Sequence, residues 1–348
     1  MSKRARRARE ATAPTPLPNE DALREGVELA GVEAPQPESI TVGPTLGGTD
    51  PGGAGAQVTA TAGDAPLRQA SLWGDAWRQL RRNPLFIIPA LLLVLFTLMA
   101  FWPSLFANGD PRDCDLSNSI LPPSREHLFG FDVQGCDYYT RVIYGTHVSL
   151  TIGLITVLFA STIAITLGSI SGFYGGKIDA VIARIADIWF AIPITLGAII
   201  ILNFLGTRGL FQVSLALMIL IWPTMMRLMR SSVLSVKEMD YVAAARALGA
   251  SDFRILRTHI LPNGIAPVIV YATITVGIVI AVEATLSFLG VGLQLPSISW
   301  GLMISGAQAR ILASPHLLFF PAVFLVVLVF TFILLGDALR DALDPRLH

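Results

Sequence analysis

Six long runs of apolar residues follow one another along the chain, with shorter polar segments between them. Each run is close to the ~20 residues that a helix needs to cross the hydrocarbon core of a bilayer. The second run is long enough to tilt or to extend beyond the lipid, and the fourth is short and contains Pro223. The pattern predicts an all-α membrane protein with six transmembrane helices, at residues 85–107, 142–173, 178–205, 210–226, 264–289 and 317–336.

The composition of the 348-residue chain agrees with a membrane protein. Only 14% of the residues are charged and 53% are hydrophobic, and the mean hydropathy is +0.61. A soluble globular domain usually has about 25% charged residues. The deficit indicates that lipid, and not water, solvates much of the surface.

The residues before the first run divide into two segments. Residues 1–68 are rich in Pro, Gly, Ala, Thr and Glu and have almost no aromatic residues, which predicts a disordered cytoplasmic tail. Its basic stretch at residues 3–9 fits solvation or contact with anionic lipid better than nucleic-acid binding. Residues 69–84 predict an interfacial amphipathic helix, or else the first turns of the following span. That helix would carry Leu72, Trp73, Trp77, Arg78, Leu80, Arg81 and Arg82.

The basic residues concentrate in alternate connections, which predicts the orientation in the membrane. They lie before the first span, between spans two and three, and between spans four and five, where the positive-inside rule places cytoplasmic segments. The members are Arg78, Arg81, Arg82, Lys177, Arg184, Arg227, Arg230, Lys237, Arg246, Arg254 and Arg257. The acidic loop at 108–141 is predicted to be extracytoplasmic. No apolar signal-peptide core follows the basic start, so we expect both termini, including residues 337–348, in the cytoplasm of a multi-pass inner-membrane protein.

Cys114 and Cys136 both fall in the 108–141 loop. In an oxidising compartment these two residues would form a disulfide, which stabilises a fold by about 3 kcal/mol in the chain-entropy model. The alternative is two unrelated free thiols. A metal site is not predicted, because no His and Cys residues have the spacing of metal ligands.

Sequence motifs for catalysis are absent. The chain has no GxxxxGK[ST] phosphate loop and no HExxH, GxSxG or CxxC motif. We therefore predict a protein that is not an enzyme, does not hydrolyse ATP itself and binds no cofactor directly.

Two acidic residues within the apolar runs are candidates for function. Asp187 follows Arg184 by three residues, which favours a local ion pair. Glu283 lies late in the fifth run, where it could line a transport pathway or hydrogen-bond to a neighbouring helix, and the structural role is slightly favoured. The spans lack the series of acids that a proton-coupled secondary transporter would need.

The connection at 227–263 is the most distinctive segment. Asp240 can cap an Ala-rich helix of about 8 residues, about 12 Å long, and Gly249 suits the left-handed position after its end. Ser251 or Asp252 can cap a second helix that runs toward Leu261 and Pro262. Such a short helix with small side chains could dock into a partner protein, or it could be an ordinary helix on the membrane surface. The residues alone favour neither.

This connection resembles the EAA signature of ABC importer permeases, EAA-x3-G-x9-I-x-L-P. The matching residues are Ala243, Ala244, Ala245, Gly249, Leu261 and Pro262. Ala243 stands where the signature usually has Glu, and His259 stands where it usually has Ile. The resemblance implies a coupling helix that docks on an ATPase by shape and not by a salt bridge. The docking residues would be Asp240, Tyr241, Ala243, Ala244, Ala245, Arg246, Gly249, Ala250, Asp252, Leu261 and Pro262.

Six further segments, in order, resemble the C-type subunit of dipeptide and oligopeptide permeases over residues 75–348. They are HLFG at 127–130, RVIYG at 141–145, GFYGG at 172–176, LSFLGVG at 286–292, SWG at 299–301 and GDALRDALDP at 336–345. The long N-terminal tail and the cysteine pair are not part of this pattern.

The resemblance implies a type I ABC importer with a five-helix permease core at 142–336. A homologous second permease, two ATP-binding-cassette ATPase subunits and an extracytoplasmic peptide-binding protein would be its partners, and ATP would act through the ATPases. Peptides are the expected substrate, and related permeases handle nickel or other small solutes. The competing classes are a secondary transporter, which would work without an ATPase, and a membrane-embedded enzyme, for which no catalytic set is visible.

Overall fold

A computed structural model describes residues 72–343 of the chain. This part is helical, and its β-structure is limited to two isolated bridges, which pair Cys114 with Cys136 and Phe131 with Asp137. The prediction of an all-α fold is therefore confirmed. The predicted disordered tail at 1–68 and the last residues of the predicted C-terminal segment lie outside the described residues.

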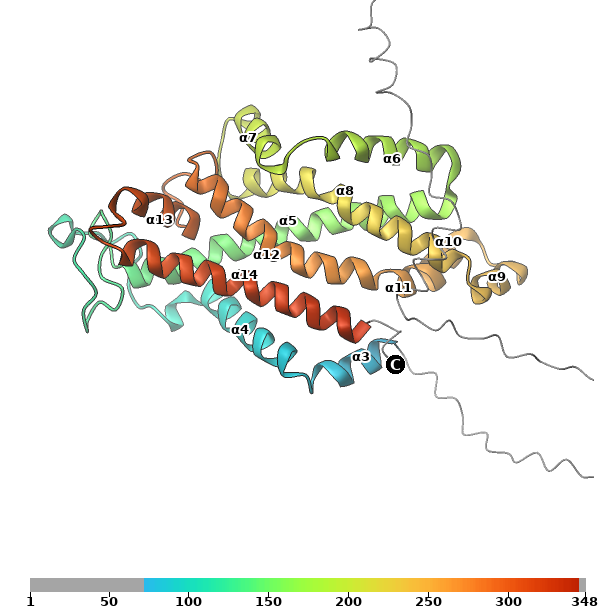
Figure 1. Ribbon diagram of the computed structural model, residues 1–348, viewed down its shortest axis with the longest axis horizontal. Helices are drawn as coiled ribbons and strands as arrows, with labels where there is room; N and C mark the ends of the chain where they lie inside the picture. The colour runs from blue at the N-terminus through green and yellow to red at the C-terminus, as the bar shows by residue number, and fades with distance from the viewer. Residues whose placement is uncertain (1–71, 344–348) are drawn as a thin grey trace, which may run out of the picture. The chain divides into compact units, whose positions relative to one another are not determined.

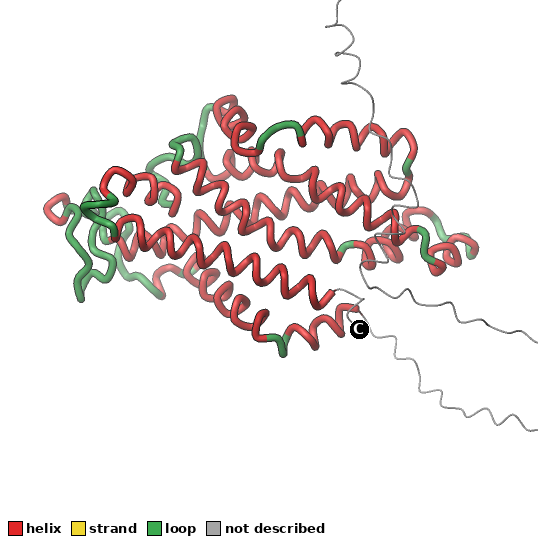
Figure 2. Tube along the Cα trace, viewed as in Figure 1, coloured by secondary structure: helices red, strands yellow, loops and turns green. Residues whose placement is uncertain are grey.

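Twelve α-helices make up the described chain (Figures 1 and 2). Five of them are long and apolar enough to cross a membrane, and the pair α6 and α7 makes a sixth span if it counts as one. The helices are α3 (Leu72–Leu80), α4 (Pro84–Phe101), α5 (Tyr138–Tyr174), α6 (Gly176–Phe190), α7 (Ile194–Leu205), α8 (Leu210–Lys237), α9 (Asp240–Ala247), α10 (Asp252–Ile255), α11 (Leu261–Gly264), α12 (Ala266–Phe288), α13 (Trp300–Ala307) and α14 (His316–Leu343).

The third predicted span is not one straight helix. Its two halves, α6 and α7, meet at an angle of 91°. Pro193 lies at the break, has no N–H to continue a helix, and disfavours the helical conformation of Ile192 before it. The tight packing of Gly197 on the side chain of Leu220, where an added Cβ would lie at 2.8 Å, fixes α7 against α8. Hydropathy alone missed this break, although Pro193 was visible within the run.

The fourth span is longer than predicted, because α8 continues from residue 226 to Lys237. The charge of Arg227 and Arg230 predicts that they lie in the following connection. The structure places both on α8 and pairs them with acids of α6. The guanidinium of Arg227 lies 2.5 Å from Asp187, and Arg230 donates two hydrogen bonds to Asp179, at 2.5 and 2.6 Å. Arg184, the predicted partner of Asp187, is more distant at 3.8 Å.

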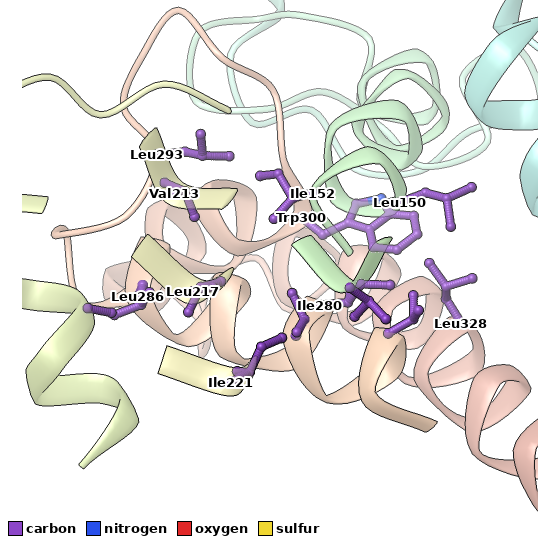
Figure 3. Close-up of a cluster of buried hydrophobic side chains, with 14 of the residues drawn as sticks. Leu150, Ile152, Val213, Leu217, Ile221, Ile280, Leu286, Leu293, Trp300 and Leu328 are labelled. Atoms are coloured by element: carbon purple, nitrogen blue, oxygen red, sulfur yellow. The ribbon is translucent and has the colours of Figure 1, made fainter. Parts of the chain in front are cut away.

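Helices α5 and α8 form the centre of the bundle. Gly168 and Gly172, four residues apart on α5, let the backbone of α8 approach closely, since an added Cβ would lie 2.6 Å from the carbonyl oxygen of Met226 and 2.9 Å from that of Arg230. Apolar side chains from α5, α8, α12, α13 and α14 fill the core of the bundle (Figure 3). Trp300 is fully buried there, and its indole N–H donates to the carbonyl oxygen of Val142 at 2.9 Å.

Helix α3 is a separate element before the first span. Asn83 ends the turn after it and caps α4, because its side chain accepts a hydrogen bond from the N–H of Leu85 at 2.9 Å. Leu80 is buried against Ala338 and Ala342 near the end of α14, while Trp77 stays exposed. The first and last helices of the described chain are thus packed together.

Candidate functional site

Helix α9 lies at the end of the bundle where α3 and the last turns of α14 also lie (Figure 1). It has the predicted length of 8 residues. The predicted cap is wrong by one position, because Met239 occupies the N-cap and Asp240 is the first helical residue. At this place the carboxylate of Asp240 is still favourable, since the N-terminus of a helix carries partial positive charge.

A Schellman motif ends α9. Gly249 has φ of +80°, which confirms the predicted left-handed conformation. Its N–H donates to the carbonyl oxygen of Arg246 at 3.0 Å, and the N–H of Ala250 donates to that of Ala245 at 3.1 Å. Ala245 and Ala250 both pack on the same buried cluster. The direction in which the chain leaves α9 is therefore fixed by two hydrogen bonds and an apolar contact.

The chain then returns to the bundle through a nearly continuous helix. Ser251 precedes α10 as its N-cap residue, without a side-chain hydrogen bond, and a π-helical segment at residues 256–260 joins α10 to α11. In this segment the N–H of Leu261 donates to the carbonyl oxygen of Leu256, five residues earlier. The wider turn accommodates Pro262, which has no N–H and would clash within a regular α-helix.

The base of this loop is anchored in the bundle. Val242 of α9, Ile255 of α10 and Ile260 are buried to 1% exposure or less. They form one cluster with residues of α5, α8 and α12, namely Phe173, Met229, Val233, Val236 and Val268. The loop that carries α9 is therefore close-packed against three long helices.

The tip of the loop is exposed and partly apolar. Leu248 is 88% exposed and Phe253 is 70% exposed. Sequence reasoning missed both, although two large apolar residues in a polar connection were the available signal. Burial raises the pKa of the half-exposed Tyr241 phenol above its ordinary value.

The structure also places each of the predicted docking residues. Those on the surface of the loop are Asp240, Tyr241, Ala243, Ala244, Arg246, Gly249, Asp252 and Pro262, while Ala245, Ala250 and Leu261 are half-buried.

Glu283 of α12 is fully buried, and not on a surface of the chain. Its Oε1 accepts hydrogen bonds from the hydroxyls of Ser287, at 2.8 Å, and Ser299, at 3.3 Å. Ser287 in turn accepts from the N–H of Leu293, and Ser299 caps α13 by accepting from the N–H of Leu302. This geometry supports the structural alternative for Glu283: it holds the 289–299 loop and α13 onto α12.

The loop at residues 102–137 lies at the end of the bundle opposite α9 (Figure 2). A disulfide joins Cys114 to Cys136 within it. Asp132 accepts hydrogen bonds from the N–H groups of Gln134 and Cys136, and it forms a mostly buried ion pair with Arg141 at the start of α5. The loop is thus tied to the bundle at its second cysteine. The described residues contain no group of His, Cys, Asp and Glu side chains that could hold a metal ion.

A family model for the "Binding-protein-dependent transport system inner membrane component" matches residues 164–348, more than half of the chain. The chain belongs to this family of transport permeases. A second model, for the "N-terminal TM domain of oligopeptide transport permease C", matches residues 71–123 of the permease. The α9 loop and Glu283 fall within the first match and Cys114 within the second, whereas Cys136 lies between the two.

Three relatives align with most of the permease. It is 40% identical over 294 residues to the oligopeptide transport system permease protein OppC of Bacillus subtilis, which covers 84% of this chain and 96% of the relative. It is 40% identical over 277 residues to the dipeptide transport system permease protein DppC of Alkalihalophilus pseudofirmus, covering 80% and 91%. It is 37% identical over 276 residues to the glutathione transport system permease protein GsiD of Pectobacterium atrosepticum, covering 79% and 91%.

Among solved structures, the permease resembles a chain of the MetNI methionine ABC transporter in an inward-facing conformation. The TM-score is 0.50 and the identity 21%, over 59% of this chain and 96% of that chain. At this identity the likeness concerns the fold alone, and it agrees with the type I importer fold expected from the sequence.

The disulfide of the permease can be tested by thiol labelling. Without reductant, neither Cys114 nor Cys136 should react with a maleimide, even after unfolding in detergent, because each sulfur is bonded to the other. After reduction both should react. The Cys114→Ser variant is the control, since it leaves Cys136 free to be labelled without reductant. Labelling of both cysteines in the unreduced parent protein would exclude the disulfide.

Proposed function

We propose that the chain is a permease subunit of an ATP-binding-cassette importer for peptides. It forms half of the translocation pathway and is driven by separate ATPase subunits. The observation that carries this proposal is the α9 loop, which has an exposed tip and a base packed on three long helices. The relatives are named as oligopeptide, dipeptide and glutathione transport permeases, which supports peptides as the substrate class.

The proposed mechanism is mechanical coupling. ATP-driven closure of the ATPase subunits pushes on the exposed tip of the α9 loop, around Leu248 at the end of α9 and Phe253 of α10. The Schellman motif at Gly249 keeps the angle of α9 fixed, so that the push reaches Val242, Ile255 and Ile260. The packed helices then reorient as bodies, as required for alternating access to the two sides of the membrane. ATP itself is bound by the partner, because the chain has no phosphate-loop motif.

The proposed assembly contains a homologous second permease, two ATPases and an extracytoplasmic peptide-binding protein. The distribution of Lys and Arg supports an orientation with α9 and both termini on the cytoplasmic side. The disulfide loop then faces the oxidising side, where a disulfide persists, and it lies where the binding protein delivers its cargo.

Uptake by the whole transporter tests the proposal. We expect proteoliposomes that contain the permease, its second permease, the ATPases and the binding protein to accumulate labelled di- or oligopeptides only with ATP. Omission of the binding protein should abolish uptake. Peptide uptake driven by an ion gradient without ATP would instead indicate a secondary transporter, and uptake of nickel without peptides would overturn the assigned substrate class.

A further inference from the structure

One face of the bundle, formed by α6, α7, α8 and α12, contains a cavity of about 190 Å³ beside the break between α6 and α7. Helices α6 and α7 lie along α8 on this side, away from α4 (Figure 1). The lining is mostly apolar, with two hydroxyl residues of special interest, Thr224 of α8 and Tyr271 of α12.

The irregular backbone at this face is incompatible with contact to lipid. Helix α6 has 15 residues, a rise of about 22 Å, so it ends before it has crossed a hydrocarbon core about 30 Å thick. The chain then turns by 91° at residues 191–193. Non-helical backbone at membrane depth is tolerated only where protein buries it or where it lines a water-filled cavity. On α8, Pro223 also lines the cavity and leaves the carbonyl of Ile219 without its regular helical donor.

Polar groups on the same face support this conclusion. The guanidinium of Arg227 lies 3.8 Å from the centre of the Phe190 ring and pairs with Asp187, and both charged side chains are about half exposed. The described residues offer no hydrogen-bond partner to the hydroxyl groups of Thr224 and Tyr271. Charged and polar side chains in membrane segments face a protein partner or water, since their exposure to lipid is costly.

The opposite face has the character of a lipid-facing surface. The exposed side chains of α4 are apolar, such as Leu85, Ile88 and Leu91. A groove along α14 is lined only by Ile, Pro, Leu, Phe, Ala and Val residues. Helices α6 and α7 also expose apolar side chains, such as Ile188 and Ile200. What distinguishes their face from the α4–α14 face is the combination of a break, a cavity with hydroxyl groups and a charged pair.

We infer that the cavity beside the α6–α7 break is a transit site in the wall of the translocation pathway, and that it takes the uncharged backbone and apolar side chains of a peptide. This inference rests on the proposed function. The hydroxyls of Thr224 and Tyr271 can hydrogen-bond to peptide amide groups, and Trp189, Leu220 and Ile278 offer apolar contacts. None of the lining residues is acidic, basic, His or Cys, so the site suits neither a metal ion nor a single formal charge.

Cysteine accessibility tests the inference in the complete transporter. Both native cysteines are bonded to each other, so an introduced cysteine is the reactive thiol of this chain, and its labelling is read on the isolated permease band. Thr224→Cys places a thiol in the cavity, and Leu91→Cys, at a position 64% exposed on α4, is the control for lipid exposure. A charged methanethiosulfonate reagent reacts with thiols in water. We expect Thr224→Cys to react at least tenfold faster than Leu91→Cys, and a transported peptide to slow its reaction severalfold.

Each other outcome overturns the inference. Equal rates for the two variants would place Thr224 against lipid or buried protein, and fast labelling that peptide does not slow would exclude a transit site for peptides. Tyr271→Phe gives an independent measurement, because it removes only a hydroxyl and should raise the KM for peptide severalfold. An unchanged KM would show that the Tyr271 hydroxyl does not contact the peptide, and would overturn the site as inferred. The proposed function has its own test, which does not depend on these variants. If that function is wrong, the parent transporter will show no ATP-dependent uptake of peptide.

Discussion

In the Gly249→Pro variant, ATP-driven uptake should fall to background while the transmembrane helices still insert into the membrane. Gly249 has φ of +80° and donates its N–H to Arg246. Proline fixes φ near −65° and has no N–H, so the Schellman motif is lost and α9 no longer keeps its angle to the bundle. Deletion of residues 243–249 should have the same effect. Uptake and ATP hydrolysis measured in the same proteoliposomes would show uncoupling directly.

Gly306→Ala is the matched control, because an added Cβ at Gly306 meets no atom within 4 Å, and its uptake should equal that of the parent. Leu248→Glu separates docking from folding, since Leu248 is 88% exposed and its replacement costs the isolated chain little. A buried charge at the docked tip should weaken binding of the ATPase by about 2 kcal/mol, roughly 30-fold. Uptake at the parental rate by the Gly249→Pro variant would contradict the coupling role of α9.

The Glu283→Ala variant should lose about 2–4 kcal/mol of stability, a fall in Tm of roughly 4–16 °C in detergent. The substitution leaves a cavity and removes the acceptor of two buried serine hydroxyls. Because those serines hold Leu293 and the start of α13, residues 289–307 should also become accessible to protease before the rest of the bundle unfolds.

Glu283→Gln is the conservative comparison. Its amide oxygen can accept from Ser287 and Ser299 as Oε1 does, so the loss of stability should stay below about 1 kcal/mol. Thermal unfolding followed by a thiol- or tryptophan-based signal would rank the parent, the Gln variant and the Ala variant. Equal stability of the two variants would show that the hydrogen bonds of Glu283 do not hold α13.

The long helices were predictable because lipid imposes a simple requirement on sequence. An apolar run of about 20 residues has few alternatives in a membrane, and the run at 264–289 corresponds closely to α12. Helix α14 begins next to the run at 317–336 but continues to Leu343, into the predicted C-terminal segment. Hydropathy could not find the end of α8, since Arg227 and Arg230 look like loop residues until their partners on α6 are known. The break at Pro193 was missed for a related reason: an averaged hydropathy does not register the loss of one N–H.

In the candidate site, too, local features could be predicted from sequence, whereas contacts between distant residues could not. The conformation of Gly249 was predictable because it depends on neighbours within a few residues. The ambiguity of Glu283 could not be resolved from sequence, since one of its partners, Ser299, lies 16 positions away across a turn. The cap at Met239 was mispredicted because Asp240 has the stronger capping propensity, while the geometry of the turn after Lys237 decides where the helix begins.

The contact between α3 and α14 has a consequence for biosynthesis. Leu80 and Ala338 pack together although 258 positions separate them. At about 5–20 residues per second, a ribosome needs roughly 13–50 s to make the intervening chain. Leu80 therefore lacks its packing partners on α14 until that helix has been made and inserted. Burial of this side chain thus requires that α14 has been made, and a chain that terminates before α14 would leave Leu80 open to quality-control proteases.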